Sequence, residues 1–258
     1  MRAAADAEAT AIELHGRGRD LLASGQPLEA ARVLRRALRL LGRPPDSSPA
    51  EGLVEHRPAV ARLLITLAVT EVYLDRPDAG FALLDEAEKL VPPEELGIVV
   101  QQRGAMLVVT GRLTDAVREL DEAVALLTRS GQHVVLARTL NSRGVLHHNA
   151  GRFRLARADL EACERLAREL PGEHRLLAKA THNHALCDLL QGDIPGALRN
   201  LALAAEQYHL AGAPALVGPV SVDRARALLA AGLATEAAAE LDSAMERLSP
   251  RTGGRERA

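Results

Sequence analysis

Residues 133–172 read HVVLARTLNSRGVLHHNAGRFRLARADLEACERLARELPG, and this stretch decides the fold. Gly144 is followed after seven positions by Gly151, and Ala156, Leu160 and Cys163 then come at spacings of five, four and three. Glycine adopts the left-handed conformation at the end of a helix without a Cβ penalty, so Gly151 predicts a turn between two helices. Small residues on both sides of the turn let the helices approach closely, because larger side chains would cost about 1–3 kcal/mol of overpacking.

The stretch therefore predicts one pair of antiparallel helices. The first runs from about Val134 to Ala150, and the second from about Leu155 to Leu170. Pro171-Gly172 ends the second helix, since proline cannot continue it.

The same frame of five positions occurs six times along the chain. In chain order its members are Gly18, Gly25, Ala30, Leu34 and Ala37; Ala68, Asp75, Gly80, Leu84 and Ala87; Gly104, Gly111, Ala116, Leu120 and Ala123; Gly144, Gly151, Ala156, Leu160 and Cys163; Ala185, Gly192, Ala197, Leu201 and Ala204; Ala225, Gly232, Ala237, Leu241 and Ala244. Internal repetition at this period predicts a solenoid of helix pairs. We expect an all-α, right-handed superhelical solenoid of about six pairs, in which each pair buries its apolar face against its neighbours.

We expect one such array over residues 1–248. A stretch rich in proline, serine and glycine, GRPPDSSPAEGLVEHRP, predicts an exposed loop at about residues 42–58. Val91-Pro92-Pro93-Glu94 marks the start of the third pair, because proline is well tolerated in a first helical turn. Residues 249–258, SPRTGGRERA, predict a disordered tail or a linker.

Composition narrows the class of protein. The 258 residues are 47% hydrophobic but 2% aromatic, which favours helices packed through leucine, valine and alanine over a β-sandwich. The net charge of −2 lacks the basic footprint of a nucleic-acid binder. The N-terminal MRAAADAEAT has no apolar signal core, and no apolar stretch is long enough for a bilayer. We expect a cytoplasmic protein that binds neither nucleic acid nor membrane.

The frame of small residue, glycine, alanine, leucine and alanine resembles the tetratricopeptide repeat (TPR), over about residues 7–248. The usual aromatic residues of that repeat are mostly replaced, for example by Leu21, Leu107, His147 and Leu228. The period is also longer than the roughly 34 residues of the TPR, so longer helices are expected. The resemblance implies a protein-interaction scaffold without enzymatic activity.

A narrower resemblance concerns two short phrases. Residues 140–144, LNSRG, and 182–186, HNHAL, resemble segments of the TPR arrays that precede caspase-like CHAT protease domains in GC-rich bacteria. No sheet-containing catalytic domain is expected in this chain, so the resemblance implies a recognition array alone or a segment that lies before a protease.

The TPR resemblance also implies that the first helix of each pair lines a concave groove. Polar and cationic side chains interrupt the apolar residues along that side of the predicted helices. The residues expected to form a partner-binding groove are Arg62, Gln101, Gln102, Arg138, Asn141, His148, Lys179, His182 and Asn183. Amides can bond a peptide backbone and arginine can hold a carboxylate, so we expect a protein or peptide ligand.

Catalytic and metal chemistry are not predicted. His184, Cys187 and Asp188 can share one helix face, which would suit a nucleophile or a metal ligand, but a buried cysteine also behaves as a small hydrophobe. Neighbouring histidines such as His147 and His148 point in different directions on a helix. No phosphate-binding glycine loop or hydrolase motif occurs. We expect no catalytic residue, no cofactor and no metal.

Three hypotheses for function stay open. The first is a scaffold that binds a peptide or partner domain in the groove. The second is a recognition or regulatory segment of a caspase-like protease system, and the third is a peptide or small-molecule sensor of a bacterial regulator. The last predicted helix, about Ala234 to Leu248, presents Leu241 with no following helix, so we expect a monomer or a weak homodimer through the terminal helices.

Overall fold

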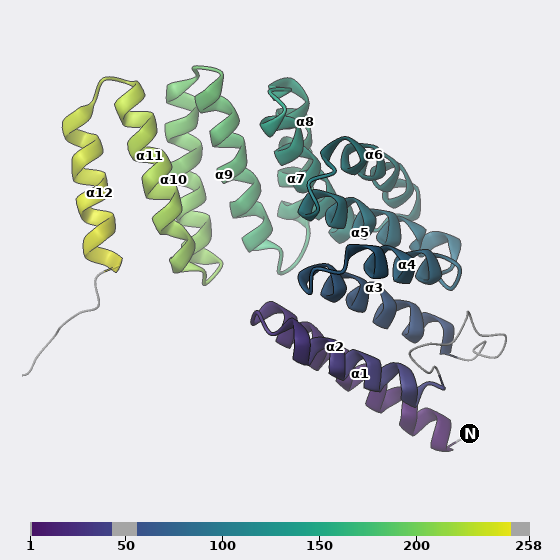
Figure 1. Cartoon of the computed structure of the whole chain (residues 1–258). Helices are drawn as coiled ribbons and strands as arrows, with labels where there is room; N and C mark the ends of the chain where they lie inside the picture. Colours follow the sequence, from purple (N-terminus) through teal and green to yellow (C-terminus); the bar gives the residue numbers. More distant parts are fainter. Residues whose placement is uncertain (1, 43–55, 249–258) are drawn as a thin grey trace, which may run out of the picture. The chain divides into compact units, whose positions relative to one another are not determined.

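The computed structural model describes residues 2–42 and 56–248 and contains twelve α-helices and no strand in those ranges (Figure 1). The chain divides into two compact units, Met1–Gln132 and His133–Ala258, with three helix pairs in each. The helices of the first unit are α1 (Arg2–Ala23), α2 (Pro27–Leu40), α3 (Arg57–Tyr73), α4 (Pro77–Glu88), α5 (Leu96–Val109) and α6 (Leu113–Ser130). Those of the second are α7 (His133–Asn149), α8 (Phe153–Glu169), α9 (His174–Leu190), α10 (Ile194–Leu210), α11 (Val217–Ala230) and α12 (Ala234–Leu248). The prediction of an all-α repeat solenoid with six helix pairs is confirmed.

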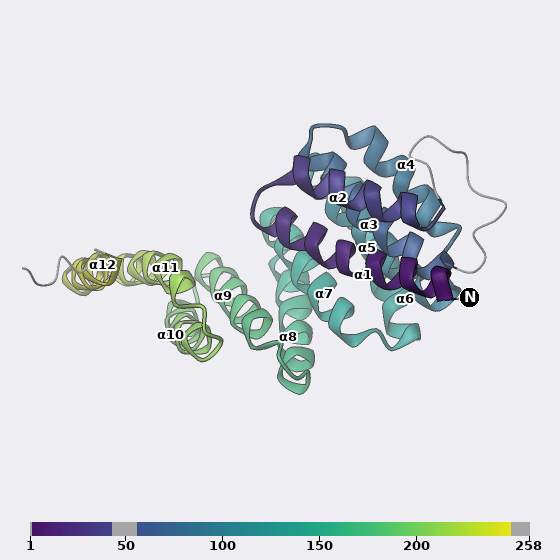
Figure 2. The same cartoon turned by 90° about the horizontal axis from the view of Figure 1, so that it is seen from below.

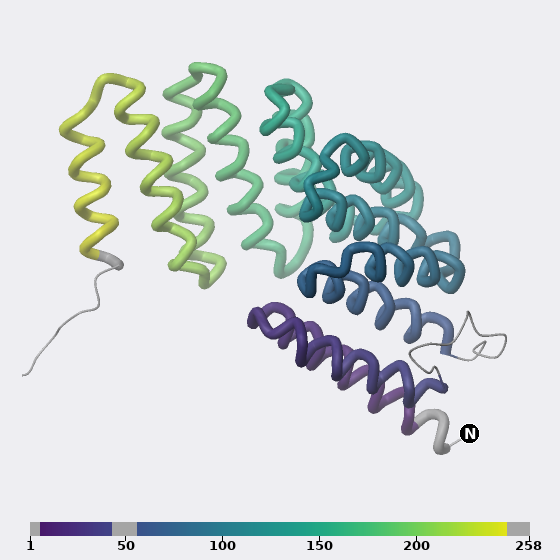
Figure 3. The backbone as a smooth tube through the Cα atoms, viewed as in Figure 1, coloured from purple at the N-terminus to yellow at the C-terminus, as the bar shows by residue number. Residues whose placement is uncertain are grey.

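The turn position of the frame closes every pair. All six of its residues have φ between 61° and 81°, and Asp75 is the one non-glycine with positive φ in the ranges the structure describes. This left-handed conformation reverses the chain within three residues, so the helices of a pair lie antiparallel, as the tube for α11 and α12 shows (Figure 3).

The small and leucine positions set the distance between the helices of a pair. A Cβ added to Gly104 would lie 2.8 Å from Cδ2 of Leu120, and one added to Gly18 would lie 2.7 Å from Cδ2 of Leu34. The leucine of the second helix therefore fills the space that the first helix leaves open. Five of the six leucines of the frame are 0% exposed, whereas Leu241 in the last pair is 37% exposed.

Neighbouring pairs also pack on each other inside each unit. The second helix of one pair contacts the first helix of the next: α2 with α3, α4 with α5, α8 with α9 and α10 with α11. The core clusters follow the same order, since Leu34 and Leu38 pack with Val60 and Leu64. In the second unit, α11 and α12 lie side by side in both views (Figure 2).

Two boundaries differ from the sequence analysis. The predicted loop of residues 42–58 is too long, because α3 already begins at Arg57; residues 43–55 and the predicted tail 249–258 lie outside the described residues. The third pair opens with a 3₁₀ turn, Pro93–Glu95, and α5 begins only at Leu96. A single array over residues 1–248 stays a prediction, since the two units are described separately.

Gly80→Ala is expected to destabilise the first unit by about 1–3 kcal/mol. A Cβ at this position would lie 2.7 Å from the backbone oxygen of Ala68, and a backbone atom cannot move without shifting α3. This clash outweighs the gain of about 1 kcal/mol in helix propensity. Gly16→Ala is the matched control in α1: nothing lies within 4 Å of its added Cβ, so it should stabilise by about 0.5–1 kcal/mol. Urea denaturation distinguishes the two, and equal stability would contradict the close contact of α3 with α4.

Candidate functional site

The first helices of the first unit enclose an open hollow of about 450 Å³. Its lining residues come from α1, α3 and α5: Arg19, Asp20, Leu22, Ala23, Ile65, Thr66, Val69, Tyr73 and Gln102. We call this set the α1/α3/α5 hollow. Gln102 is the one predicted groove residue among them.

The chemistry of the hollow is mixed. Leu22, Ile65 and Val69 supply apolar surface, and the ring of Tyr73 is 60% exposed beside them. Arg19, Asp20 and Gln102 are the polar members with long or charged side chains. A large exposed aromatic next to apolar surface and a few polar groups is typical of a binding site for a partner.

One hydrogen bond holds the first two of these helices together. His15 Nε2 lies 2.8 Å from Thr66 Oγ1, which joins α1 to α3 beside the hollow. Burial lowers the pKa of His15, and the charges of Arg19 and Arg62 lower it further. The imidazole is therefore neutral near pH 7, and the charge of the α1/α3/α5 hollow comes from Arg19 and Asp20.

The three predicted groove residues of the first unit have different surroundings. Gln102 lines the hollow. Arg62 is exposed on α3, with its guanidinium 3.7 Å from Glu95. Gln101 is half-buried on α5 and does not line the hollow.

The predicted groove residues of the second unit mostly bridge neighbouring first helices. Arg138 of α7 bonds Glu173 at 2.6 Å, next to the start of α9, and Nδ2 of Asn183 donates to Oδ1 of Asn141 at 2.9 Å. His148 Nδ1 lies 3.2 Å from Cys187 Sγ, and His182 Nε2 lies 3.0 Å from Asp223 Oδ2 on α11. These side chains differ from repeat to repeat because they pair across repeats.

Among the predicted groove residues of the second unit, Asn141 and Lys179 differ strongly in solvent exposure. Asn141 is 3% exposed, so its amide is not open to a ligand in this structure. Lys179 is exposed on α9 and remains available. The structure thus brings Asn141 together with Asn183 and His182 together with Asp223, and it leaves Lys179 apart from these bridges.

Comparison with solved structures identifies the fold. No protein-family model and no curated protein matches the chain. BtubC (BKLC) from P. vanneervenii is similar with a TM-score of 0.64 and 15% identity, over 99% of this chain and 96% of that chain. The TPR-like repeats of a putative kinesin light chain from Podosopora anserina give a TM-score of 0.62 and 19% identity, over 74% of this chain and 95% of that chain. The chain has the tetratricopeptide-repeat fold. The apo form of RapI is also similar, with a TM-score of 0.70 and 10% identity over 93% of this chain and 67% of that chain.

The TPR fold of this chain contains buried acids that the sequence analysis missed. Glu71 and Asp188 occupy the position three residues after the small residue, where other repeats of the chain have Leu21, Leu107, His147 or Leu228. Both carboxylates are almost fully buried, and each is paired with an arginine of the preceding second helix. The signal in the sequence was an acid at a repeat position that holds leucine in three of the six repeats.

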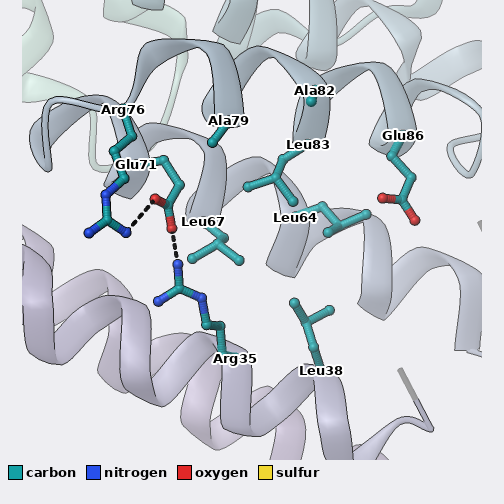
Figure 4. A pocket seen from close by; sticks show the side chains of 10 residues that line it. All are labelled: Arg35, Leu38, Leu64, Leu67, Glu71, Arg76, Ala79, Ala82, Leu83 and Glu86. Atoms are coloured by element: carbon teal, nitrogen blue, oxygen red, sulfur yellow. Dashed lines mark hydrogen bonds and ion pairs between the residues drawn. The ribbon is translucent and has the colours of Figure 1, made fainter. Parts of the chain in front are cut away.

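Glu71 lies at the end of a second hollow, of about 370 Å³, between α2 and the pair α3/α4 (Figure 4). Figure 4 shows its carboxylate between Arg35 and Arg76, with which it forms ion pairs. Leu38, Leu64 and other apolar side chains cover the rest of the wall. Glu71 offsets one of the two arginine charges and Glu86 also lines the hollow, so this space between neighbouring TPRs has no excess of positive charge that would favour an anion.

The trio of His184, Cys187 and Asp188 is not an isolated group: His184 Nε2 lies 3.7 Å from Asp188 Oδ1, and each member also has partners outside the trio. His184 Nδ1 lies 3.0 Å from Glu164 Oε1, and Asp188 accepts hydrogen bonds from Arg157 at 2.5 Å and Asn200 at 2.8 Å. The ranges that the structure describes contain no group of three or more His, Cys, Asp or Glu side chains that could hold a metal ion. No described helix is both long and apolar enough to span a membrane.

Both thiols are expected to be unreactive in the folded protein. Burial raises the pKa of Cys163 to about 12 and that of Cys187 to about 11, so neither is a thiolate near pH 8. A colorimetric thiol reagent should find no reactive cysteine in the native chain and two in guanidinium chloride. Rapid labelling of Cys187 under native conditions would contradict the structural role assigned to it.

His184 is expected to titrate above its usual range. Its hydrogen bond to Glu164 raises the pKa, and the charges of Asp188, Glu164 and Glu161 add to this against the effect of burial. Because the folded pKa is raised, the stability it contributes is fully present below about pH 6.5 and is lost as the pH rises through the folded value. NMR titration should give a midpoint for His184 above that of His148, whose pKa burial lowers. The reverse order would contradict the contact with Glu164, and His184→Gln should remove this pH dependence.

Proposed function

We propose that this chain is a non-enzymatic scaffold that binds a peptide, or an extended segment of a partner protein, in the α1/α3/α5 hollow. The observation that carries the proposal is the exposed ring of Tyr73 beside the apolar side chains of Ile65 and Val69, inside a hollow of about 450 Å³. An apolar surface of this kind on two adjacent helices, α1 and α3, is costly to leave in water, which favours an occupant.

The shape of the hollow favours a chain segment over a compact small molecule. Helices α1, α3 and α5 all contribute to it, and it is open to solvent. Helical-repeat solenoids bind partners along such surfaces. The apolar residues would take one or two side chains of the ligand, while Gln102 can bond its backbone groups.

The charged residues of the hollow favour neither an acidic nor a basic ligand. Arg19 and Asp20 are neighbours in the hollow and offer one cation and one anion. We therefore expect a peptide with apolar anchor residues and little net charge, rather than a strongly acidic one.

The predicted groove residues of the second unit have a different role in this proposal. Arg138, Asn141, His148, His182 and Asn183 link neighbouring first helices, so they stabilise that unit and are left out of the proposed site. Lys179 stays a predicted contact.

The test uses peptides selected from a phage-displayed random library on the intact chain. Val69→Glu places a charge on the apolar surface and should weaken the best peptide at least about tenfold, which corresponds to about 1.4 kcal/mol. Tyr73→Ala should weaken it comparably. Val109→Glu is the matched control, because this valine of α5 is exposed and does not line the hollow.

Fluorescence anisotropy measures the affinities, and circular dichroism checks that each variant stays helical. Equal affinities for Val69→Glu and Val109→Glu would place the binding elsewhere. A library that yields no binder would argue against a peptide ligand.

A further inference from the structure

The last helix of the chain presents an apolar stripe that equivalent helices bury. Leu241 is 37% exposed and Met245 is 63% exposed, and Ala238 is exposed beside them. We call Ala238, Leu241 and Met245 the terminal stripe. In the first pair the corresponding residues are Ala31, Leu34 and Leu38, which are at most 3% exposed because α3 packs on them.

Helix α5, which packs on α4 in the same way, carries a basic residue at the contact. Arg103 directly precedes the small residue Gly104 on α5, and it pairs with Asp85 at 2.9 Å and Glu88 at 2.7 Å on α4. Asp85 lies five positions after Gly80, the small residue of its own helix. At this junction a first helix places a base opposite an acid of the preceding second helix, whereas at the α2/α3 junction the same two positions hold Leu67 and Arg35.

The α8/α9 junction of the second unit repeats this arrangement, and the α10/α11 junction, with Ala202 in place of the acid, does not. His184 directly precedes Ala185 on α9, and it contacts Glu164 at 3.0 Å and Glu161 at 3.9 Å on α8. Glu161 again lies five positions after the small residue, Ala156. The equivalent position on α12 is Asp242, five after Ala237. Asp242 is exposed and has no ion-pair partner in the part of the chain that the structure describes.

The first helix of the chain, α1, carries a basic residue that is complementary in charge to Asp242. Arg17 directly precedes Gly18 on α1, and it is exposed. Leu14 and Leu21 are half-buried one turn before and one turn after it. Arg17 does not line the α1/α3/α5 hollow, so this face of α1 is separate from the proposed peptide site.

The register of the existing pairs aligns these two faces. On α8 and α9, Arg157 lies one after the small residue and bonds Asp188, which lies three after the small residue of α9. The same register on α12 and an α1 helix places Ala238 opposite Leu21 and Asp242 opposite Arg17. Met245, at the position of Glu88 and Glu164, would lie beside Arg17 and toward Leu14. Apolar residues thus meet apolar residues, and a carboxylate meets a guanidinium.

We propose that α1 of a second copy of this chain docks on the terminal stripe of α12, in the way that a further first helix would. Such a head-to-tail contact is heterologous, so it can repeat from copy to copy instead of closing into a dimer. A symmetric contact between two α12 helices would instead bring Asp242 of one copy near Asp242 of the other. Like charges at an interface are unfavourable. Glu13 on α1 would lie near Glu246, so Glu13→Lys should tighten the contact.

The test measures mass against concentration for the intact chain by sedimentation velocity. The average mass should rise above 27.5 kDa with concentration. Arg17→Asp and Asp242→Arg should each weaken the association at least about tenfold, because each places like charges opposite one another. Arg36→Asp is the control, since this exposed arginine of α2 undergoes the same charge change away from both faces.

Two further samples in the sedimentation experiment exclude a general effect of charge or folding on the association. The double variant Arg17→Asp/Asp242→Arg restores opposite charges within one chain and should associate again. An equimolar mixture of the two single variants should also associate, because each end then meets an opposite charge on the other chain. The proposal is overturned if the wild type stays at 27.5 kDa at every concentration, if the single variants associate as the wild type does, or if neither the double variant nor the mixture recovers.

Discussion

Leu160→Ala is expected to lower the free energy of unfolding of the second unit by about 2–5 kcal/mol. Leu160 is 0% exposed, and a Cβ on Gly144 of the facing helix would lie only 3.0 Å from its Cγ. Truncation therefore opens a cavity between α7 and α8 that the close-packed backbones cannot collapse to fill. Urea denaturation monitored by circular dichroism measures the change.

Leu241→Ala is the matched control for that prediction. It changes the same position of the frame in the same unit, but its side chain is 37% exposed. Its truncation removes less buried apolar surface, and water can enter the space that it leaves. The loss of free energy of unfolding should therefore be less than half of that for Leu160→Ala. Equal costs at the two positions would contradict the burial that distinguishes an internal pair from the last one.

Asp188→Ala is expected to destabilise the second unit by about 2–4 kcal/mol. The carboxylate is almost fully buried and accepts hydrogen bonds from Arg157 of α8 and Asn200 of α10. Without it, both donors lose their partner at the junction of three helices. Arg157 is 37% exposed in its side chain and can turn toward water, which keeps the cost below that of a fully buried pair.

The control for Asp188 is Asp115→Ala. Asp115 pairs with Arg112 and Arg118 within one turn of α6, but it lies at the surface, where ion pairs contribute little. Thermal unfolding should therefore show a clear loss for Asp188→Ala and almost none for Asp115→Ala. A small effect at Asp188 would mean that the buried carboxylate is not a link between pairs.

The local frame could be predicted from the sequence because its causes are local. A turn residue with positive φ, such as Gly151, and a small residue opposite a leucine, such as Gly144 opposite Leu160, act over a few residues or one helix pair. The helix ends followed from the same signals, apart from the early start of α3 at Arg57 and the 3₁₀ turn before α5.

The candidate site was harder to predict, because its residues depend on contacts between repeats. Asn141 and Asn183 are 42 positions apart and bond each other, so two amides that suggested a ligand site satisfy one another instead. The α1/α3/α5 hollow includes Tyr73 and Asp20, which the repeat frame did not single out. These two residues line the hollow because α1, α3 and α5 lie next to one another in the folded unit.

The sequence by itself determined the helix pairs, their turns and the close approach within each pair, since backbone conformation and side-chain size at fixed spacings are enough for that. Only the tertiary structure decided which polar residues remain open to a partner. Whether a side chain such as His182 or Lys179 faces a neighbouring helix or solvent depends on the packing of one repeat on the next, and the spacing within a single repeat does not contain that information.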